Sequence, residues 1–185
     1  MTKINIKNVV DSLIDTFIEA GKISINLRND GLIKEIKPDN TPVSNGDLEV
    51  NKIITSKLKE LTPEILIVSE ETSENKSTKN LKDFWLVDPI DGTYDYINNL
   101  DEFTINAGLI LNRKPVAGLI YAPSKKRMFY SYGDNEAFEL SNGKTVKLNG
   151  SKNFDNNQIK FVSYSNKLKP EIDQIHKKLN VKEFT

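Results

Sequence analysis

The chain contains no cysteine among its 185 residues, so its sequence excludes disulfide bonds and thiolate metal sites. It contains a single histidine, His176, which lies among lysines and is predicted to be exposed to solvent. Lys and Arg together number 26, as do Asp and Glu, so the formal net charge is zero. This balance argues against a protein dedicated to binding a nucleic-acid polymer or an acidic membrane.

The sequence also lacks any apolar run of transmembrane length, and charged residues occur throughout its first 17 positions. A secretory signal peptide needs an uncharged apolar core, so we expect no signal peptide and a cytoplasmic location. Apolar residues make up 37% of the chain and charged residues 28%, which is ordinary for a globular protein. The length allows one domain with a sizeable core, or one domain and part of another.

Apolar residues recur at helical spacing in two N-terminal stretches and at strand spacing after them. The first helical stripe spans residues 4–25, and the second runs from Leu48 to Leu61 and stops before Pro63. Between them, residues 28–42 are polar and predict irregular structure or a short hairpin. A short buried strand is predicted at 65–68, and further strands at 84–87, 104–111, 116–121, 128–132, 137–140, 145–148 and 159–163. Residues 112–115 predict a hairpin connection, and Asn142-Gly143 predicts a turn. A last amphipathic helix is predicted from Leu168, Ile172, Ile175 and Leu179. Two helices, a mainly antiparallel sheet and the start of an αβ segment indicate an α+β fold.

Acidic residues follow two of the predicted strands. Asp88 and Asp91 flank a bend at Pro89, and Glu70 follows the strand at 65–68. If these strands are neighbours, the three carboxylates meet at one edge of the sheet. Oxygen ligands of this kind favour a hard cation, Mg²⁺ before Zn²⁺.

A helix start is predicted directly after these acids, at Gly92 and Thr93. The N-terminus of a helix offers free N–H groups and a positive dipole end to an anion. Carboxylates that hold a metal beside such a helix end suggest metal-assisted phosphoryl transfer to water.

Each of these residues also has an ordinary structural interpretation, and spacing alone does not decide between the two. The sequence Asp-Pro-x-Asp-Gly is good turn chemistry. Glu70 and Glu71 are also typical of a solvated pair in a loop. Asp47 is typical of an acid in the first turn of a helix. Trp85 lies in an apolar strand and is predicted to belong to the core.

Taken in chain order, five motifs resemble the inositol monophosphatase-like family of Mg²⁺-dependent, lithium-sensitive phosphatases. The motifs are N-T-P-V-S-N-G-D at 40–47, V-S-E-E at 68–71, W-L-V-D-P-I-D-G-T at 85–93, E-F-T-I-N-A-G-L-I at 102–110 and G-L-I-Y-A-P at 118–123. The resemblance extends from about residue 10 to the end of the chain. Within the family, the sequence is most similar to the CysQ-type 3′(2′),5′-bisphosphate nucleotidases. The resemblance implies a layered α/β sandwich of the sugar-phosphatase type.

The resemblance also implies roles for particular residues. Metal ligands for two or three Mg²⁺ ions would be Glu70, Asp88, Asp91 and the backbone carbonyl of Ile90. Asp47 and Thr93, together with Glu70, would orient and deprotonate the attacking water. The substrate phosphate would contact Glu70, Ile90, Asp91, Gly92 and Thr93.

The sequence departs from the family pattern in two respects. Family members continue into a second αβ half with a W-D-x-A motif, whereas the only tryptophan here, Trp85, precedes a leucine. We therefore expect a truncated chain, with a metal-binding phosphatase lobe at 1–155 and an incomplete C-terminal lobe at 156–185. In addition, Tyr94, Asp95 and Tyr96 replace the Lys-Glu-Phe of the nucleotidases, which removes a positive charge beside the phosphates.

The resemblance implies a phosphomonoesterase that hydrolyses adenosine 3′,5′-bisphosphate to AMP and phosphate with Mg²⁺. An inositol monophosphatase, or another phosphatase of small sugar phosphates, remains an alternative. A further alternative is an inactive, truncated module that binds a metal or a nucleotide. The expected partner is a small phosphate ester, and homodimerisation stays open. Lys125, Lys126 and Arg127 could form a second anion site or an ordinary solvated run of charges.

Overall fold

The computed structural model describes residues 4–37, 40–72, 80–134, 136–150, 160–161, 169–179, 181 and 183–184. The chain divides into two compact units, residues 1–148 and 149–185, and each is described by itself. The elements of the first unit are α1 (Ile6–Asp30), β1 (Lys34–Ile36), β2 (Pro42–Ser44), α2 (Asn45–Leu61), β3 (Leu66–Ser69), β4 (Phe84–Asp91), α3 (Thr93–Ile97), β5 (Thr104–Leu111), β6 (Lys114–Ala122), β7 (Arg127–Tyr132), β8 (Ala137–Ser141) and β9 (Lys144–Lys147).

Both predicted N-terminal helices are confirmed, and side chains cap their first turns. The side chain of Asn5 accepts the N–H of Asn8 at the start of α1, which extends five residues beyond its predicted end. At the start of α2, the Ser44 N–H donates to Asp47 Oδ2 at 2.8 Å and the Gly46 N–H donates to Ser44 Oγ at 3.2 Å. Such caps satisfy N–H groups that have no partner inside the helix. The short hairpin predicted between the helices is also present, as antiparallel β1 and β2.

Seven strands form one sheet in the order β3-β4-β5-β6-β7-β8-β9. Only β3 and β4 run parallel, and every later pair is antiparallel, which confirms the prediction of a mainly antiparallel sheet. The turn between β5 and β6 has positive φ at Asn112 and Arg113, and the turn between β8 and β9 at Asn142 and Gly143. Two-residue turns with φ above zero match the twist of the flanking strands.

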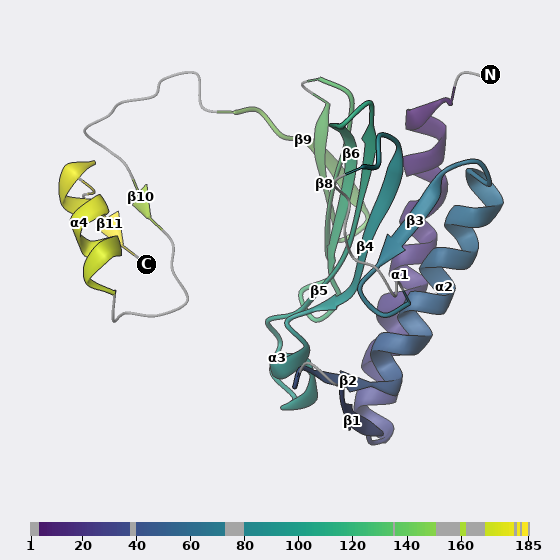
Figure 1. Cartoon of the computed structure of the whole chain (residues 1–185), viewed down its shortest axis with the longest axis horizontal. Coiled ribbons are helices and arrows are strands. Elements are labelled where there is room, and N and C mark those ends of the chain that lie inside the picture. The colour runs from purple at the N-terminus through teal and green to yellow at the C-terminus, as the bar shows by residue number, and fades with distance from the viewer. Residues whose placement is uncertain are drawn as a thin grey trace. The chain divides into compact units, whose positions relative to one another are not determined.

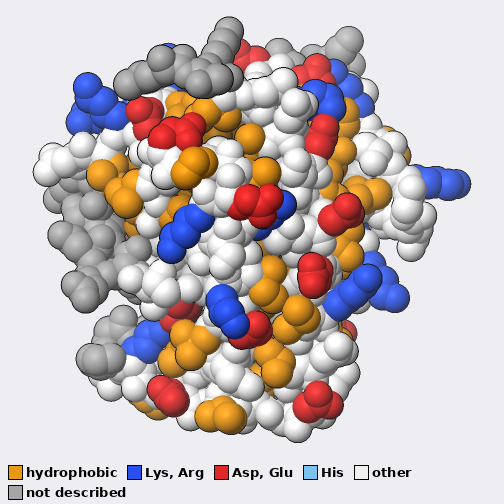
Figure 2. Space-filling model, turned by 90° about the vertical axis from the view of Figure 1, so that its right-hand side faces the viewer, with side chains coloured by type: hydrophobic (Ala, Val, Ile, Leu, Met, Phe, Trp, Pro, Cys, Tyr) orange, Lys and Arg blue, Asp and Glu red, His pale blue; other side chains and the backbone are white. Residues whose placement is uncertain are grey.

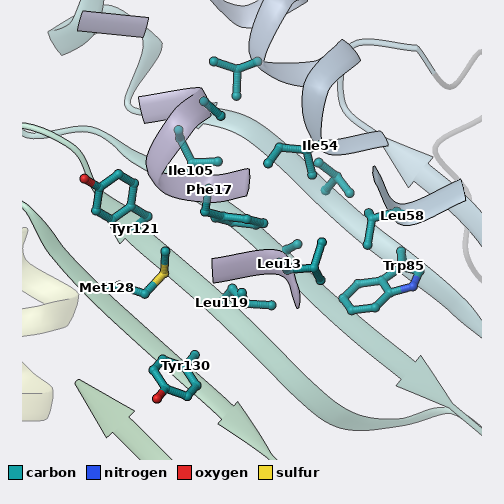
Figure 3. Packing of buried hydrophobic residues seen from close by; sticks show 14 of the residues in the cluster. Leu13, Phe17, Ile54, Leu58, Trp85, Ile105, Leu119, Tyr121, Met128 and Tyr130 are labelled. Carbon is teal, nitrogen blue, oxygen red and sulfur yellow. The ribbon is translucent and has the colours of Figure 1, made fainter. Parts of the chain in front are cut away.

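Helices α1 and α2 pack side by side on one face of this sheet (Figure 1). Alternate strand residues point into the layer between them, and Trp85 and Val87 of β4 are both buried there. Phe17 of α1 and Leu58 of α2 meet this face from the helices, and Figure 3 shows them within the packed cluster. Trp85 also donates its indole N–H to Thr62 Oγ1 at 3.0 Å, so the prediction that it belongs to the core is confirmed.

The opposite face of the sheet carries apolar side chains that stay exposed. Leu66, Leu86 and Ile120 are each about half exposed on this face. The strand predicted at 65–68 was expected to be buried, and for Leu66 this is wrong because its side chain points away from the helices. Asp88 and Asn106 lie opposite each other in the register of β4 and β5 and belong to this same face.

Strand β4 is longer than the sequence predicts, because it continues through the Asp-Pro-x-Asp segment to Asp91. Asp88 pairs with Asn106 and Asp91 pairs with Thr104, and the register shifts between these two pairs. Pro89 lies inside this irregularity. Proline has no N–H for the ladder and is tolerated where the pairing is interrupted.

The second unit contains β10 (Lys160–Phe161), α4 (Pro170–Lys178) and β11 (Glu183–Phe184). Strands β10 and β11 are parallel and α4 lies between them in sequence, as in the predicted αβ segment. The prediction that His176 is exposed is wrong: it is buried, whereas Ile175 and Leu179 are half exposed. The buried face of α4 therefore lies one residue along the helix from the predicted apolar stripe. Leu168 and the predicted domain boundary at 155/156 lie outside the described residues, and the boundary stays a prediction.

Charged side chains of both signs are interspersed over the side of the molecule that α1 and α2 present (Figure 2). This distribution agrees with the balanced composition of the chain. No helix in the described part of the chain combines the length and the apolar character needed to cross a membrane.

Candidate active site

The parallel pairing of β3 and β4 brings two of the predicted site residues together. Ser69 pairs with Val87, so Glu70 and Asp88 are the next residues along the two neighbouring strands. The Glu70 N–H donates to the carbonyl of Val87 at 3.1 Å, which fixes the backbone at this point. The condition on which the sequence prediction depended, that these strands are neighbours, is therefore met.

Asp88 lies in an environment that disfavours its charge. Burial raises the pKa of its carboxyl group to about 7, and the nearby charges of Glu70 and Asp91 act in the same direction. Its Oδ1 is buried and has no hydrogen-bond partner within the described residues. A buried carboxylate oxygen with no donor is costly, and a bound cation would remove that cost.

Asp91 lies beyond the irregularity in β4 and is held by the neighbouring strand. Asn106 of β5 donates its side-chain N–H to Asp91 Oδ2 at 3.2 Å. No role was predicted for this asparagine, which belongs to the E-F-T-I-N motif. Strand alternation could have found it, since Asn106 pairs with Asp88 and shares its face.

Lys37 is a further charged group at this edge that sequence reasoning missed. Its Nζ lies 2.7 Å from Glu71 Oε2 and 3.8 Å from Glu70 Oε1. The Glu71 side chain is only 4% exposed, so the interpretation of both glutamates as a solvated pair is wrong for Glu71. Burial raises the pKa of Glu71, and Lys37 opposes this effect. Lys37 lies in a polar, non-periodic stretch, and no sequence signal connects it to these acids.

Asp47 is both a helix cap and a neighbour of Thr93. Its carboxylate accepts the N–H and the hydroxyl of Ser44, and the residue is fully buried. Burial raises the pKa of Asp47, and the hydrogen bonds from Ser44 oppose this rise. The Thr93 hydroxyl lies 3.3 Å from Asp47 Oδ1 and 2.9 Å from the carbonyl oxygen of Ile90.

The turn from β4 into α3 depends on Gly92. Its φ of 90° is a left-handed conformation that other residues rarely adopt. A Cβ added at this position would also lie 2.6 Å from the carbonyl oxygen of Glu102. The predicted start of a helix at Gly92 and Thr93 is confirmed, although α3 is only five residues long.

The side chains at this edge supply oxygen donors, which suit a hard divalent cation such as Mg²⁺. No three His, Cys, Asp or Glu side chains in the described ranges are grouped closely enough to hold an ion as a complete cluster. The carboxylates are connected in pairs instead, and Asp88 is the member that interacts with both Glu70 and Asp91. The donor set and the orphaned Oδ1 of Asp88 therefore fit a cation, and the half-exposed Glu70 already interacts with Asp88.

Asp88 and Asn106 also border a hollow of about 550 Å³ on the sheet face opposite α1 and α2. Its walls include Leu86, Ile120 and Phe129. The volume lies within the range of small-molecule sites.

A family model for the inositol monophosphatase family matches residues 5–183. The chain belongs to the inositol monophosphatase family. Members of this family are phosphatases, and the layered α+β arrangement predicted from the sequence agrees with this membership.

Two curated relatives are similar to the chain over most of its length. The 3′(2′),5′-bisphosphate nucleotidase CysQ of Haemophilus influenzae is 38% identical over 124 residues, which cover 65% of this chain and 46% of the relative. The 3′(2′),5′-bisphosphate nucleotidase CysQ of Buchnera aphidicola is 36% identical over 160 residues, which cover 80% of this chain and 60% of the relative. The chain therefore spans about half to three-fifths of the length of these curated relatives.

A solved structure supports the fold. The IMPase/NADP phosphatase complexed with NADP and Ca²⁺ is 18% identical, with a TM-score of 0.77 over 100% of this chain and 68% of that chain. At this identity the similarity establishes the shared fold. The crystal structure also records that a member of this fold group binds a divalent metal ion.

Proposed function

We propose that the chain is part of a Mg²⁺-dependent phosphomonoesterase that hydrolyses adenosine 3′,5′-bisphosphate to AMP and phosphate. The observation that carries this proposal is the position of Asp88, next to both Glu70 and Asp91, on the strand whose Ile90 carbonyl lies 2.9 Å from the Thr93 hydroxyl. The similarity to two bisphosphate nucleotidases supports the choice of substrate.

In this proposal the metal would be held by Glu70, Asp88, Asp91 and the carbonyl of Ile90. When bound, Mg²⁺ would supply a Lewis acid that acidifies water and offsets charge on the phosphate. Burial first, and then the charges of Glu70 and Asp91, raise the pKa of Asp88, and a bound cation would offset both causes. The peptide N–H groups of Gly92 and Thr93 would donate to the phosphate, and Gly92 permits close approach because it has no side chain.

Thr93 and Asp47 form the proposed route for the proton of the attacking water. A threonine hydroxyl has one proton, so Thr93 can donate to Asp47 or to the Ile90 carbonyl, but not to both at once. When the hydroxyl donates to Asp47, the lone pairs of Thr93 can accept a hydrogen bond from water. Asp47 is fully buried, so it has little alternative hydration and stays directed at the hydroxyl.

The substrate is the least constrained part of the proposal. Tyr94 is exposed beside the site, where the nucleotidase pattern has a lysine. Two of the three cations considered as a second anion site are paired with acids: Lys125 lies 3.4 Å from Glu102, and Arg127 lies 2.7 Å from Glu139. These pairs favour the alternative of a solvated run of charges. A cytoplasmic location and a homodimer also stay predictions.

Phosphate release from adenosine 3′,5′-bisphosphate and from inositol 1-phosphate, measured with and without Mg²⁺, tests the function. We expect Mg²⁺-dependent release with higher kcat/KM for the bisphosphate, and loss of release in Asp91→Asn. A preference for the inositol ester would favour an inositol monophosphatase. Binding of Mg²⁺ without release from either ester would favour the inactive module.

A further inference from the structure

A second cavity, of about 620 Å³, lies on the helix side of the first unit and shares no residue with the candidate active site. It is bordered by the C-terminal half of α1, by the segment from Tyr121 to Met128 that includes the β6–β7 turn, and by the β8–β9 turn at residues 140–143. Its volume is that of a site for a small organic molecule.

The floor of the cavity is apolar and depends on a close approach of α1 to β6. A Cβ at Gly21 of α1 would lie 2.4 Å from Cε1 of Tyr121, so only glycine lets this ring lie against the helix. Figure 3 shows Tyr121 and Met128 at the end of the packed cluster that is distant from Trp85. Ile18, Ile25 and Leu140 complete the apolar walls. Flat aromatic groups pack well against such side chains.

The charged residues around the cavity are mainly cationic. Lys22, Arg28 and Lys126 border it, and Asp101 is the one acid among its lining residues, which leaves a net charge of +2 (three minus one). Asp101 already forms an ion pair with Arg28, whose Nη2 lies 3.3 Å from Asp101 Oδ1. Lys22 and Lys126 have no ion pair with any other described residue. The rim therefore offers two lysine ammonium groups to an anion.

Arg28 is the polar side chain of this cavity that is buried and held in place by hydrogen bonds. Its side chain is 9% exposed and is held by two hydrogen bonds, from Nη1 to the Leu100 carbonyl at 2.7 Å and from Nη2 to Asp101. Its Nε is buried and has no acceptor within the described part of the chain. The two hydrogen bonds hold the guanidinium, and with it a positive charge, at the edge of the cavity.

We propose that this cavity binds a small aromatic anion, a planar ring with one carboxylate, sulfonate or phosphate group. The ring lies against Ile18, Ile25 and Leu140, and the anionic group meets Lys22 and Lys126, with the charge of Arg28 nearby. Neither the ring nor the anionic group alone is expected to bind well, because the ring needs the contact area of the apolar walls and the anion needs the charge of the rim.

Isothermal titration with 2-naphthoate tests the proposal, since this anion has no phosphate to hydrolyse. We expect a dissociation constant of about 1 mM or lower, and binding at least about tenfold weaker for the neutral naphthalene-2-methanol. The double variant Lys22→Ala/Lys126→Ala should weaken 2-naphthoate binding about tenfold. A matched pair of exposed lysines on α2, Lys52→Ala/Lys59→Ala, should leave it unchanged. Asn26→Trp should block the cavity without altering its charge, after its melting curve has established that it is folded.

The proposal is overturned by any of three results. One is that no binding is detected at a 2-naphthoate concentration about 5-fold above the expected limit of the dissociation constant. Another is equal affinity in the Lys22→Ala/Lys126→Ala variant and its α2 control. The third, in a titration with Mg²⁺ present, is loss of binding in Asp88→Asn, which would place the anion on a metal ion at the carboxylates instead. Retained binding in Asp88→Asn together with loss in the lysine pair supports the proposal, whatever substrate the enzyme uses.

Discussion

Thr93 Oγ1 lies 3.3 Å from Asp47 Oδ1 and 2.9 Å from the carbonyl oxygen of Ile90. This places one hydroxyl between a buried carboxylate and a backbone oxygen of the strand that carries Asp88 and Asp91. The hydroxyl therefore connects the start of α2 to the end of β4.

Thr93→Ala should lower kcat about a hundredfold and leave Mg²⁺ affinity unchanged, because the hydroxyl positions water but does not hold the metal. Thr93→Ser keeps the hydroxyl and should retain most of the activity. Titration calorimetry beside phosphate release separates the two effects. Loss of Mg²⁺ binding in Thr93→Ala would show that the assigned role is wrong.

The metal-free protein should become less stable as the pH rises from about 4 to about 7. The folded-state pKa of Asp88 is raised from 3.8 to about 7, so the folded state binds this proton more tightly than the unfolded state does. The stability that protonated Asp88 contributes is therefore lost across this window, by an amount on the order of 1 to 3 kcal/mol.

Chemical denaturation in EDTA at several pH values measures this loss. Asp88→Asn removes the titration and should flatten the dependence relative to the unsubstituted chain. Equal pH dependence in both proteins would rule out Asp88 as its source.

Gly92→Ala should destabilise the first unit by about 2 kcal/mol more than Gly143→Ala. Both glycines have positive φ, so each substitution carries a backbone cost of about 1–2 kcal/mol. Only at Gly92 does the added Cβ also meet a backbone atom, the Glu102 carbonyl oxygen, whereas nothing lies within 4 Å at Gly143. Urea denaturation of both variants measures the difference, and equal losses would contradict the close approach.

The exposed apolar face of the sheet should promote self-association at high protein concentration. Ile120 is 48% exposed and borders the 550 Å³ hollow, and apolar patches of this kind commonly form contacts between molecules. Ile120→Ser should reduce association in light scattering, whereas Leu179→Ser on α4 should not. The opposite ranking would assign the association to the stripe on α4.

The fold was predictable where the sequence repeats a local pattern. The helical stripes of α1 and α2, the turns at Asn112 and Asn142 and the core position of Trp85 all follow from spacing and turn chemistry. Leu66 and His176 were predicted wrongly because local spacing does not say which side of an element packs against a neighbour. The end of β4 was missed because Pro89 suggests a break, and only the pairing with β5 carries the strand past it.

Part of the candidate site was also predictable from local sequence patterns. Glu70 and Asp88 could be placed together because each follows a short apolar strand. Lys37 could not, since its contact with Glu71 joins segments 34 residues apart and has no local pattern. Asp47 fits both interpretations, and its role as a cap does not exclude a role at the site. The catalytic and metal-binding roles of these residues stay predictions until they are measured.

Calorimetric titration of the chain with Mg²⁺ tests the central claim most directly, that Glu70, Asp88 and Asp91 form a metal site. The unsubstituted chain should bind Mg²⁺, and a hundredfold excess over the dissociation constant should stabilise it by about 2.7 kcal/mol. Asp91→Asn should abolish both effects, whereas Asp83→Asn, which removes an acid just before β4, should leave both unchanged. Equal Mg²⁺ binding by the unsubstituted chain and Asp91→Asn, or no binding by either at millimolar Mg²⁺, would contradict the account.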